Sequence, residues 1–502
     1  MEKRTAQRLA ALAASWLFAA AGAFGYDTFT EDGFIYETTR DSDRVDITGW
    51  KPILETTCGD TLHIPASVTH NGKEYKVSSI FIKALQGLTT VRSVVIGEGI
   101  ESIWREAFAW SANLESVYIP ASVTGVGGGA FAGCYSLKSI KVDPRNEDLD
   151  SRDDCNAVIY TEDDLLEAAC PATRIPPSVK TIGEYAFVSC NTIEELVIPE
   201  GVTSIEDEAF GGCSSLRKVT LPQSLEKIGD FAFGRCRSLT SMFIPKNVKK
   251  IDEGNIFYKC DNLTSIEVDA GNAVYDSRSG CNGIVRKADS ALVAACRTTT
   301  ISNDIGKLES DCFAGTDIHS VRIPKSVRTM NETPFSVCYG IDSISVEEGN
   351  PTYISPKGSN AILTKDGKTL VLGCRTTVIP DGVKTIGNYA FAGNYTREML
   401  RLPDGIEEIG DGAFQNCQNL IEAIIPASVK HLGLNAFTDC RNLKAVKLSP
   451  AMDGIVRDTF SGCTNLSFVD IPEGITFVDK GAFRDCRNLK NLNMPASVVR
   501  DK

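Results

Sequence analysis

Histidine is scarce in this sequence, with only His63, His70, His319 and His431 among 502 residues. None of them lies in an H-E-x-x-H pattern, and no two cysteines have the C-x-x-C spacing that metal sites commonly use. The G-x-S-x-G nucleophile elbow and the G-x-x-x-x-G-K-[ST] phosphate loop are also absent. These absences predict a protein that is not an enzyme, with no catalytic residues, no metal and no cofactor.

Positive charge is also in short supply. The chain has 52 Lys and Arg residues against 65 Asp and Glu residues, which gives a net charge of -13. Because binding to a phosphate backbone needs clustered Lys and Arg, nucleic acid is not an expected partner. The hydrophobic content of 42% is ordinary for a folded chain, so wholesale disorder is excluded.

A long apolar run occurs only near the N-terminus. Lys3, Arg4 and Arg8 precede the apolar stretch from Leu9 to Ala23, a pattern typical of a secretory signal peptide. Its 15 residues are fewer than the roughly 20 that a membrane-spanning helix needs. We predict that residues 1–23 are a cleaved signal peptide, with an uncleaved anchor as the alternative, and that no membrane span remains after cleavage. The protein is expected to be exported, either secreted or at the cell surface, with the periplasm as an alternative.

What the sequence has in abundance is repetition. Aligned on Ile-Pro, one unit reads I-P-x-S/G-V-x-x-I-G-x-x-A-F-x-x-C-x-x-L-x-x-V-x and spans 23 residues. Such a period with an L-x-x-L-x-L core predicts a leucine-rich repeat solenoid, in which L-x-x-V-x-I is a short strand. One unit buries too little apolar surface to offset the entropy of ordering it, so the copies must stack. The units begin at Ile96, Ile119, Ile175, Ile198, Leu221, Ile244, Ile301, Ile323, Ile379, Leu402, Ile425, Leu448 and Ile471.

Across residues 60–498, this unit resembles the bacterial BspA-like class of leucine-rich repeats. The stretch LHIPASVTHNGKEYKVSSI, from Leu62 to Ile80, is similar to the usual first repeat of that family. We expect an α/β repeat fold, a solenoid with a continuous parallel sheet on the concave face and turns or short helical pieces opposite. The resemblance implies a secreted or surface protein that adheres to host proteins or other cells, and it supplies no catalytic motif.

Three segments interrupt the repeats, and each is predicted to be a β-hairpin insertion. The third contains Asp366-Gly367 at its centre, which is a strong hairpin signal. The predicted organisation is a signal peptide at 1–23, an N-terminal β-hairpin cap at 24–60, repeat blocks at 61–142, 175–268, 301–346 and 379–502, and hairpin insertions at 143–174, 269–300 and 347–378.

Cysteines in the first two insertions are candidates for disulfides. Pairing centred as in the third hairpin places Cys155 opposite Cys170, and Cys281 opposite Cys296. Directly opposed residues have Cα atoms about 4.5–5.5 Å apart, within the range that a disulfide tolerates. An exported protein can form such bonds, and the alternative is that these are buried thiols. The third insertion has Ser359 opposite Cys374, which leaves that cysteine without a partner.

Ten further cysteines occupy one column of the repeat and are expected to be a ladder of buried thiols, because free cysteine is among the most buried residue types. They are Cys134, Cys190, Cys213, Cys236, Cys260, Cys338, Cys417, Cys440, Cys463 and Cys486.

The positions marked x in L-x-x-V-x-I are expected to point outward, because side chains alternate along a strand. Most are polar, and the apolar exceptions are candidates for a binding face, since exposed aromatic residues commonly anchor partners. The alternative is that they are scattered surface residues without a role. The candidates are Tyr118, Val197, Phe243, Ile421, Ile424 and Phe468.

The sequence therefore favours a non-enzymatic secreted or cell-surface protein that mediates protein–protein or cell-adhesion interactions. Its expected partner is an extracellular protein or glycan. The alternative is a structural or scaffolding component of a cell envelope or multi-protein assembly. The last repeat unit is incomplete at Lys502, which predicts self-association through an uncapped C-terminal repeat.

Overall fold

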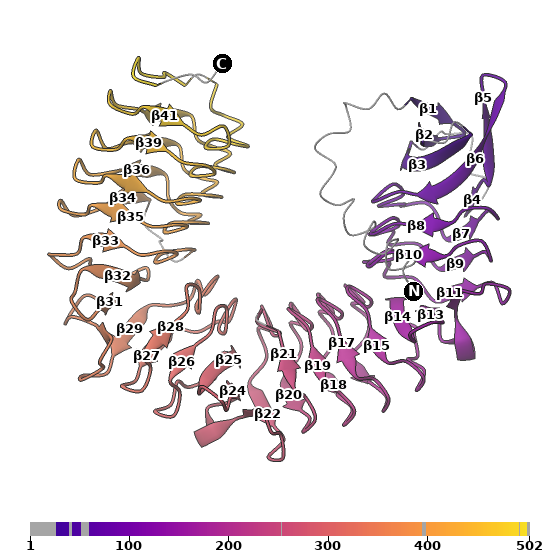
Figure 1. Cartoon of the computed structure of the whole chain (residues 1–502), viewed down its shortest axis with the longest axis horizontal. Helices are drawn as coiled ribbons and strands as arrows, with labels where there is room; N and C mark the ends of the chain where they lie inside the picture. Colours follow the sequence, from indigo (N-terminus) through magenta and orange to yellow (C-terminus); the bar gives the residue numbers. More distant parts are fainter. Residues whose placement is uncertain are drawn as a thin grey trace. The chain divides into compact units, whose positions relative to one another are not determined.

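The computed structural model describes residues 27–39, 43–51, 60–252, 254–393, 398–490 and 492–498. The predicted signal peptide at 1–23 lies outside these ranges. The chain divides into two compact units, one up to residue 252 and one from residue 274 onward, with the residues between them divided between the two. Within each unit the strands are stacked, as the arrows in Figure 1 show.

The 23-residue repeats form a long and a short strand, and within a sheet each strand pairs in parallel with its equivalent in the next repeat. In the first unit, one repeat supplies β9 (Ser116–Ile119) from its L-x-x-V-x-I stretch and β10 (Gly125–Val126) from the residues before its glycines. β9 pairs with β11 so that Ser116 lies beside Ser139, which is 23 residues later. The sequence period is therefore the register of the parallel pairing.

We call the strands formed by L-x-x-V-x-I the long strands. They are β4 (Thr61–Ile64), β7 (Ser93–Ile96), β9, β11 (Ser139–Val142), β16 (Glu195–Val197), β18 (Lys218–Thr220), β20 (Ser241–Ile244), β22 (Ser265–Val268), β27 (Ser320–Ile323), β29 (Ser343–Val346), β34 (Met399–Arg401), β36 (Glu422–Ile424), β38 (Ala445–Lys447) and β40 (Phe468–Asp470).

The short strands are two residues long. They are β8 (Ser102–Ile103), β10, β15 (Thr181–Ile182), β17 (Ser204–Ile205), β19 (Lys227–Ile228), β21 (Lys250–Ile251), β26 (Lys307–Leu308), β28 (Thr329–Met330), β33 (Thr385–Ile386), β35 (Glu408–Ile409), β37 (His431–Leu432), β39 (Gly454–Ile455) and β41 (Phe477–Val478).

The expected continuous parallel sheet is not formed. The long strands are divided among separate sheets, of which β4, β7, β9 and β11 make one and β34, β36, β38 and β40 make another. The sheet ends after β11, β22 and β29, where a segment without the repeat pattern follows in the chain, and also between β18 and β20, which belong to consecutive repeats. This corrects the expectation drawn from the period alone.

The α/β class is also not what the described residues form, because they contain no α-helix and only the 3-10 turns η2 (Arg152–Asp154) and η3 (Arg278–Gly280). The stretch around A-F is a chain of turns, since two of its backbone positions have positive φ. In one repeat these are Tyr185 at 60° and Ser189 at 59°. A right-handed helix of L-residues cannot include such residues.

Before the first repeat, the described residues form an antiparallel group rather than one hairpin. β1 pairs with β2 and β2 with β3, and β3 then pairs in parallel with β6. β5 and β6 form a hairpin around Asn71 and Gly72, which both have positive φ. The bounds are β1 (Thr28–Glu31), β2 (Phe34–Thr38), β3 (Arg44–Trp50), β5 (Ser67–His70) and β6 (Lys73–Ile80).

Each interrupting segment contains three strands that pair antiparallel in chain order. The third of these strands then pairs in parallel with a short strand of the following repeat, so the segment replaces one level of the stack. The strands are β12 (Leu149–Asp150), β13 (Ala157–Tyr160) and β14 (Leu165–Ala169); β23 (Tyr275–Asp276), β24 (Gly283–Arg286) and β25 (Ala291–Ala295); and β30 (Tyr353–Ile354), β31 (Ile362–Thr364) and β32 (Thr369–Leu372).

A buried asparagine anchors the start of each segment to the preceding repeat. The Asn146 amide nitrogen donates to the carbonyls of Pro120 and Val123 at 3.1 and 2.7 Å. Its side-chain oxygen accepts from the backbone nitrogens of Asp148 and Leu149 at 2.9 and 2.8 Å. The equivalent asparagines are Asn272 and Asn350. These asparagines were not among the residues predicted to be important, although N-E-D-L, N-A-V-Y and N-P-T-Y recur at the same place in the three segments.

The core of most repeats contains a phenylalanine and a cysteine, whereas Ser111, Thr316 and Asn394 take the cysteine position in three of them. In the second unit, the rings of Phe391, Phe414 and Phe437 are stacked with centroids 5.4 and 5.3 Å apart. The Cys440 thiol donates to the carbonyl oxygen of Phe414 at 3.1 Å, and the same contact recurs from repeat to repeat. The thiols of the repeat column are therefore structural, as expected for buried cysteines.

The two predicted disulfides are absent, because Cys155, Cys170, Cys281 and Cys296 are free thiols. The pairing of β13 with β14 shifts by one residue after Val158, so that Ala157 lies opposite Ala169. This bulge removes the facing arrangement of the two cysteines that uninterrupted pairing predicts. β24 and β25 contain the same bulge after Ile284.

We expect denatured, unreduced protein to titrate with all 17 cysteines as thiols. The 16 described cysteines are free, so no pair is available for an intramolecular bond among them. The measurement is a thiol count with a chromogenic disulfide reagent in denaturant, with a chemically reduced sample as the control. A count of 13 would restore the two hairpin disulfides.

Candidate functional site

The outward side chains of the long strands form the surface that the sequence analysis singled out, and we call it the strand surface. On β9, Val117 and Ile119 are buried, whereas Tyr118 between them is exposed. β20 shows the same alternation, with Phe243 exposed between Met242 and Ile244. The period of two therefore places the x positions in solvent, as expected for strands covered on one face.

Four of the six candidate residues are well exposed. The exposed fraction is 39% for Tyr118, 70% for Val197, 42% for Phe243 and 59% for Phe468. Ile421 and Ile424 are half-buried. The six do not form one patch, because they lie on β9, on β16 and β20, and on or beside β36 and β40.

Three candidates lie on one sheet of the second unit. The pairing places Met399 beside Glu422, Glu422 beside Ala445, and Ala445 beside Phe468. Ile424 lies on the same sheet, between Arg401 and Lys447. The backbone of Ile421 continues this ladder, accepting from Lys444 at 2.8 Å. We call the apolar side chains of this sheet the Phe468 patch, which consists of Met399, Ile421, Ile424, Ala445 and Phe468.

Charged side chains lie both within and around this patch, with Glu422 between Met399 and Ala445. Arg401 and Lys447 flank Ile424 across the strands, and Asp470 lies beside Lys447. The aliphatic stems of Arg and Lys extend an apolar surface while their charged ends stay in water. An aromatic side chain within an apolar group and a charged rim is the composition of many protein-binding surfaces.

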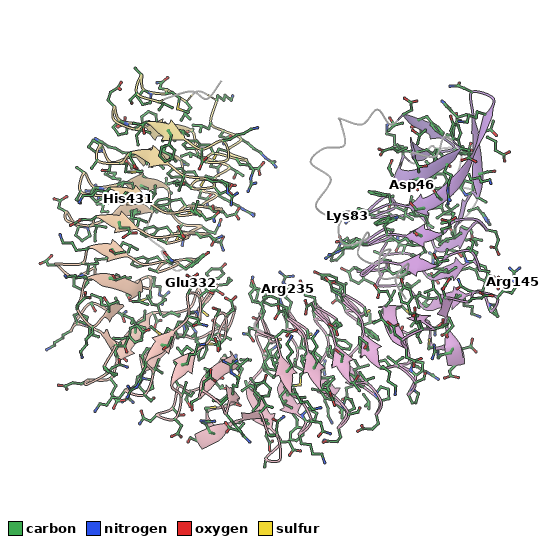
Figure 2. The ribbon with its side chains drawn as sticks, in the orientation of Figure 1. Asp46, Lys83, Arg145, Arg235, Glu332 and His431 are labelled. Carbon is green, nitrogen blue, oxygen red and sulfur yellow. The ribbon has the colours of Figure 1, made fainter. Side chains whose placement is uncertain are left out.

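Tyr118 in the first unit differs from Phe468 because its hydroxyl is already engaged. It donates to Asp143 Oδ2 at 2.6 Å, and Arg145 contacts the same oxygen at 2.7 Å. Hydrogen bonds from Arg145 and Tyr118 lower the pKa of Asp143, and the bond to Asp143 raises the pKa of Tyr118. Arg145 lies on the opposite side of this unit from Lys83, as the labels in Figure 2 show. The network fixes the ring of Tyr118 on the strand surface.

Val197 and Phe243 occupy the same column two repeats apart, with Thr220 of β18 at the equivalent position of the repeat between them. Val197 lies beside Thr220 in the parallel pairing of β16 and β18. The next strand, β20, carries Phe243 at the equivalent position, 23 residues after Thr220. This group is narrower than the Phe468 patch, since it has two apolar side chains rather than five.

Within the described ranges, no group of three or more His, Cys, Asp or Glu side chains is arranged to hold a metal ion. In that same part of the chain, no helix has the length and apolar character that crossing a membrane requires.

A family model for the BspA type leucine rich repeat region matches the chain in 6 copies, over residues 67–152, 171–279, 293–358 and 373–500. These ranges make up most of the chain. No curated protein matches it. The period inferred from the sequence and the family match therefore agree on the repeat class.

Several solved structures are similar to this chain over most of its length. A leucine rich cell surface protein of Faecalibacterium prausnitzii has 21% identity and a TM-score of 0.39, covering 93% of this chain and 94% of its own. A leucine-rich repeat protein of Bacteroides ovatus has 26% identity and a TM-score of 0.33, covering 92% and 93%. The pneumococcal vaccine antigen PcpA has 15% identity and a TM-score of 0.28, covering 94% and 92%.

Proposed function

The chain belongs to the BspA-type leucine-rich repeat family, and on this premise we propose that it is a non-enzymatic binding protein of the cell exterior. It contacts an extracellular macromolecule, a protein or a glycan, through its strand surface, and so mediates adhesion. The three segments at 143–174, 269–300 and 347–378 act as hairpin insertions that divide this surface into separate faces.

The observation that carries this proposal is the Phe468 patch. Phe468 is 59% exposed although it lies on a sheet whose other face is fully packed. An exposed phenylalanine side chain leaves apolar surface in water. A partner that covers this surface gains about 25 cal/mol of binding free energy per Å² of apolar area removed from water. Stacked repeats hold such side chains on a rigid surface, which limits the entropy lost on binding.

The proposed location follows from two features of the chain. The basic residues Lys3, Arg4 and Arg8 followed by an apolar run favour export. Repeat proteins of this class with exposed binding faces are suited to contacts outside the cell. Fractionation of cells that express the full chain, with detection in medium, surface and periplasmic samples, tests the location directly.

We expect the Phe468→Ala substitution to weaken binding to the partner by about tenfold or more, because an exposed aromatic anchor typically contributes over 1 kcal/mol. The measurement is a screen of purified residues 26–502 on extracellular-matrix proteins and glycans, followed by titration of each hit at physiological and high salt. Apolar contacts persist at high salt, whereas surface charge attractions fade.

The matched control is Leu434→Ala, which removes an apolar side chain with 40% exposure from a turn of the same unit. It should leave the affinity within about twofold, since isolated surface changes have small effects. Equal losses in both variants would argue against a site on the strand surface. No hit in the screen, together with self-association in sedimentation runs, would favour the scaffolding role instead.

A further inference from the structure

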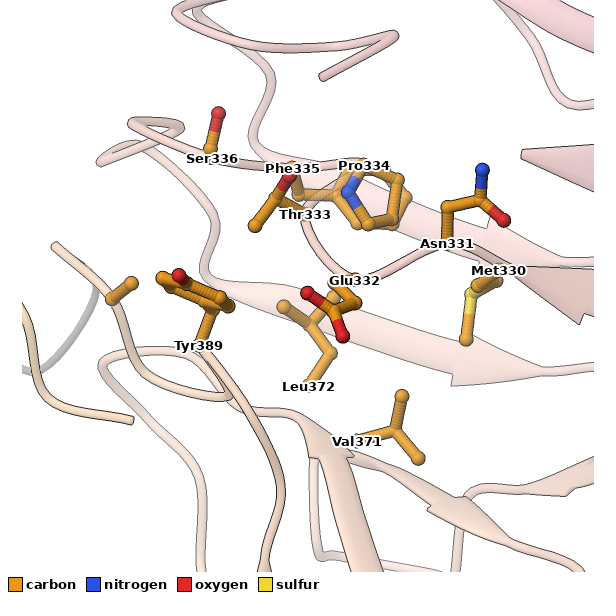
Figure 3. A pocket seen from close by; sticks show the side chains of 11 residues that line it. Met330, Asn331, Glu332, Thr333, Pro334, Phe335, Ser336, Val371, Leu372 and Tyr389 are labelled. Atoms are coloured by element: carbon orange, nitrogen blue, oxygen red, sulfur yellow. The ribbon is translucent and has the colours of Figure 1, made fainter. Parts of the chain in front are cut away.

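The second unit contains a pocket that the sequence analysis did not find. It lies between the turns of the repeat that begins at Ile323 and those of the repeat that begins at Ile379, where the third interrupting segment separates them in the chain. Its polar lining includes Glu332, Thr333 and Tyr389. In Figure 3, the Glu332 carboxylate points toward the Tyr389 ring.

The first unit has an equivalent position after its first interrupting segment, and the tyrosine there, Tyr185, is covered by an arginine side chain. Tyr185 occupies the same position of its repeat as Tyr389, and the first interrupting segment precedes it. The guanidinium carbon of Arg105 lies over the Tyr185 ring, 4.4 Å from the ring centroid. Arg105 also pairs with Glu106 at 3.4 Å and with Glu184 at 3.9 Å. A cation over an aromatic face is a favourable contact, and more so where water is partly excluded.

Aligning the repeats shows how the surroundings of Tyr389 in the second unit differ from those of Tyr185 in the first. The residue equivalent to Arg105 is Ser310, so the second unit has no cation at this position. The residue equivalent to Gly128 is Glu332, so the second unit has a carboxylate on this turn, whereas in the first unit a carboxylate near Gly128 comes from Glu167 of β14. No described residue forms an ion pair with Glu332 or lies as a cation over the Tyr389 ring.

Other polar groups near the pocket have partners already. The Asn331 amide donates to Glu309 Oε2 at 2.5 Å, and Lys307 contacts the other oxygen of Glu309 at 3.0 Å. The Ser336 hydroxyl donates to Asp311 Oδ1 at 2.5 Å. Glu332 is therefore the carboxylate of this wall that is available to a ligand.

The Tyr389 ring is held in place by a glycine of the following repeat. A Cβ atom at Gly412 would lie 2.3 Å from Tyr389 Cε1, so the ring packs directly on the backbone there. Burial raises the pKa of Tyr389, and the negative charges of Glu332, Asp411 and Asp311 raise it further. The pocket thus combines a fixed aromatic face with a negative potential, the two features that attract a cation.

We propose that this pocket binds the guanidinium group of an arginine side chain on a protein partner, with the Tyr389 ring against its face and the Glu332 carboxylate as its ion-pair partner. Arginine is the occupant because Arg105 fills the equivalent place within the chain itself. The net charge of -13 favours approach of a basic partner. This site lies on the turns and does not depend on the strand surface or on the proposed function.

The test is a titration of purified residues 26–502 with the peptide Gly-Arg-Gly, monitored by saturation-transfer NMR. The uncharged isostere Gly-citrulline-Gly is the matched ligand. We expect the arginine peptide to bind at least about tenfold more tightly than the citrulline peptide, because only the former has a cation for the ring and the carboxylate. Equal binding of the two peptides, or no binding of either, would overturn the proposal.

Three variants locate the site. Glu332→Gln and Tyr389→Leu should each lower the affinity for Gly-Arg-Gly by about tenfold, whereas Tyr389→Phe keeps the ring and the affinity. Glu473→Gln changes an exposed carboxylate elsewhere in the same unit and should have no effect. Circular dichroism establishes that each variant is folded. Full affinity in Glu332→Gln would contradict the assignment, while leaving the strand-surface proposal untouched.

Discussion

The folded protein is expected to lose stability steeply as the pH rises above about 8.5, the usual pKa of an unfolded cysteine. Burial is the largest cause of a raised pKa at many thiols of the core, and it raises the pKa of Cys213 and of Cys338 to about 12. The described cysteines whose pKa is raised are Cys134, Cys155, Cys170, Cys190, Cys213, Cys236, Cys281, Cys312, Cys338, Cys440, Cys463 and Cys486.

The direction follows from proton binding. Between the unfolded and the folded pKa, the folded state keeps the thiol proton and the unfolded state releases it, so unfolding is favoured as the pH rises. Each such thiol costs about 1.4 kcal/mol per pH unit, or about 2 kcal/mol at pH 10. Five of them in one cooperative unit remove about 10 kcal/mol, which is comparable to the whole stability of a typical domain.

The measurement is the melting temperature from pH 7 to pH 10 in the presence of a reductant. A variant with Cys190, Cys213 and Cys236 replaced by Ala should show a shallower decrease in the alkaline range, because three of the titrating groups are gone. A melting temperature that stays constant up to pH 10 in the unmodified protein would show that the core thiols ionise without unfolding.

The second large effect is expected from Asn350→Ala, which should lower the free energy of unfolding by about 4 kcal/mol. The Asn350 amide nitrogen donates to the carbonyls of Pro324 and Val327 at 2.8 and 3.0 Å. Its oxygen accepts from the backbone nitrogens of Thr352 and Tyr353 at 2.9 and 2.8 Å. The side chain is 1% exposed, so alanine removes four hydrogen bonds where water has little access, although the Pro324 carbonyl still accepts from the Val327 backbone nitrogen at 3.3 Å.

Urea denaturation of the full chain, followed by circular dichroism, measures this change. Asn303→Ala is the matched control, because Asn303 is exposed in the same unit and should shift the free energy of unfolding by less than about 0.5 kcal/mol. Asn350→Asp keeps the acceptor oxygen but loses the two donor contacts and buries a charge, so it should be at least as unstable as the alanine variant. If Asn350→Ala unfolds at the same urea concentration as Asn303→Ala, the asparagine does not anchor the segment.

Much of the repeat itself could be predicted from the sequence. The 23-residue period predicted which strands pair, since Ser116 lies beside Ser139. The alternation in L-x-x-V-x-I predicted that Tyr118 and Phe243 are exposed between buried neighbours. Both features depend on contacts between equivalent residues of adjacent repeats, so the sequence pattern of every repeat carries the same information.

The turns and the cysteine pairing could not be predicted in this way. A-F-x-x-C reads equally as a short helix, and the choice depends on positive φ at residues such as Tyr185, which stacking with the next repeat fixes. The bulge after Val158 shifts β13 against β14 by one residue, which no hairpin signal in the sequence predicts. The prediction of two disulfides was therefore wrong because the register of each hairpin differs by one residue from the one assumed.

The sequence by itself determined the repeat class, the register of the parallel strands and the residues that form the core. Only the tertiary structure decided where the sheets end, how buried asparagines attach the interrupting segments, and which side chains meet across a break. Arg105 contacts Tyr185 although 80 residues separate them, and nothing in the repeat pattern pairs those positions. The physical reason is that the repeat pattern specifies contacts between equivalent residues of adjacent repeats. Where an interrupting segment breaks the array, residues at different repeat positions come together, and only their packing determines which of them touch.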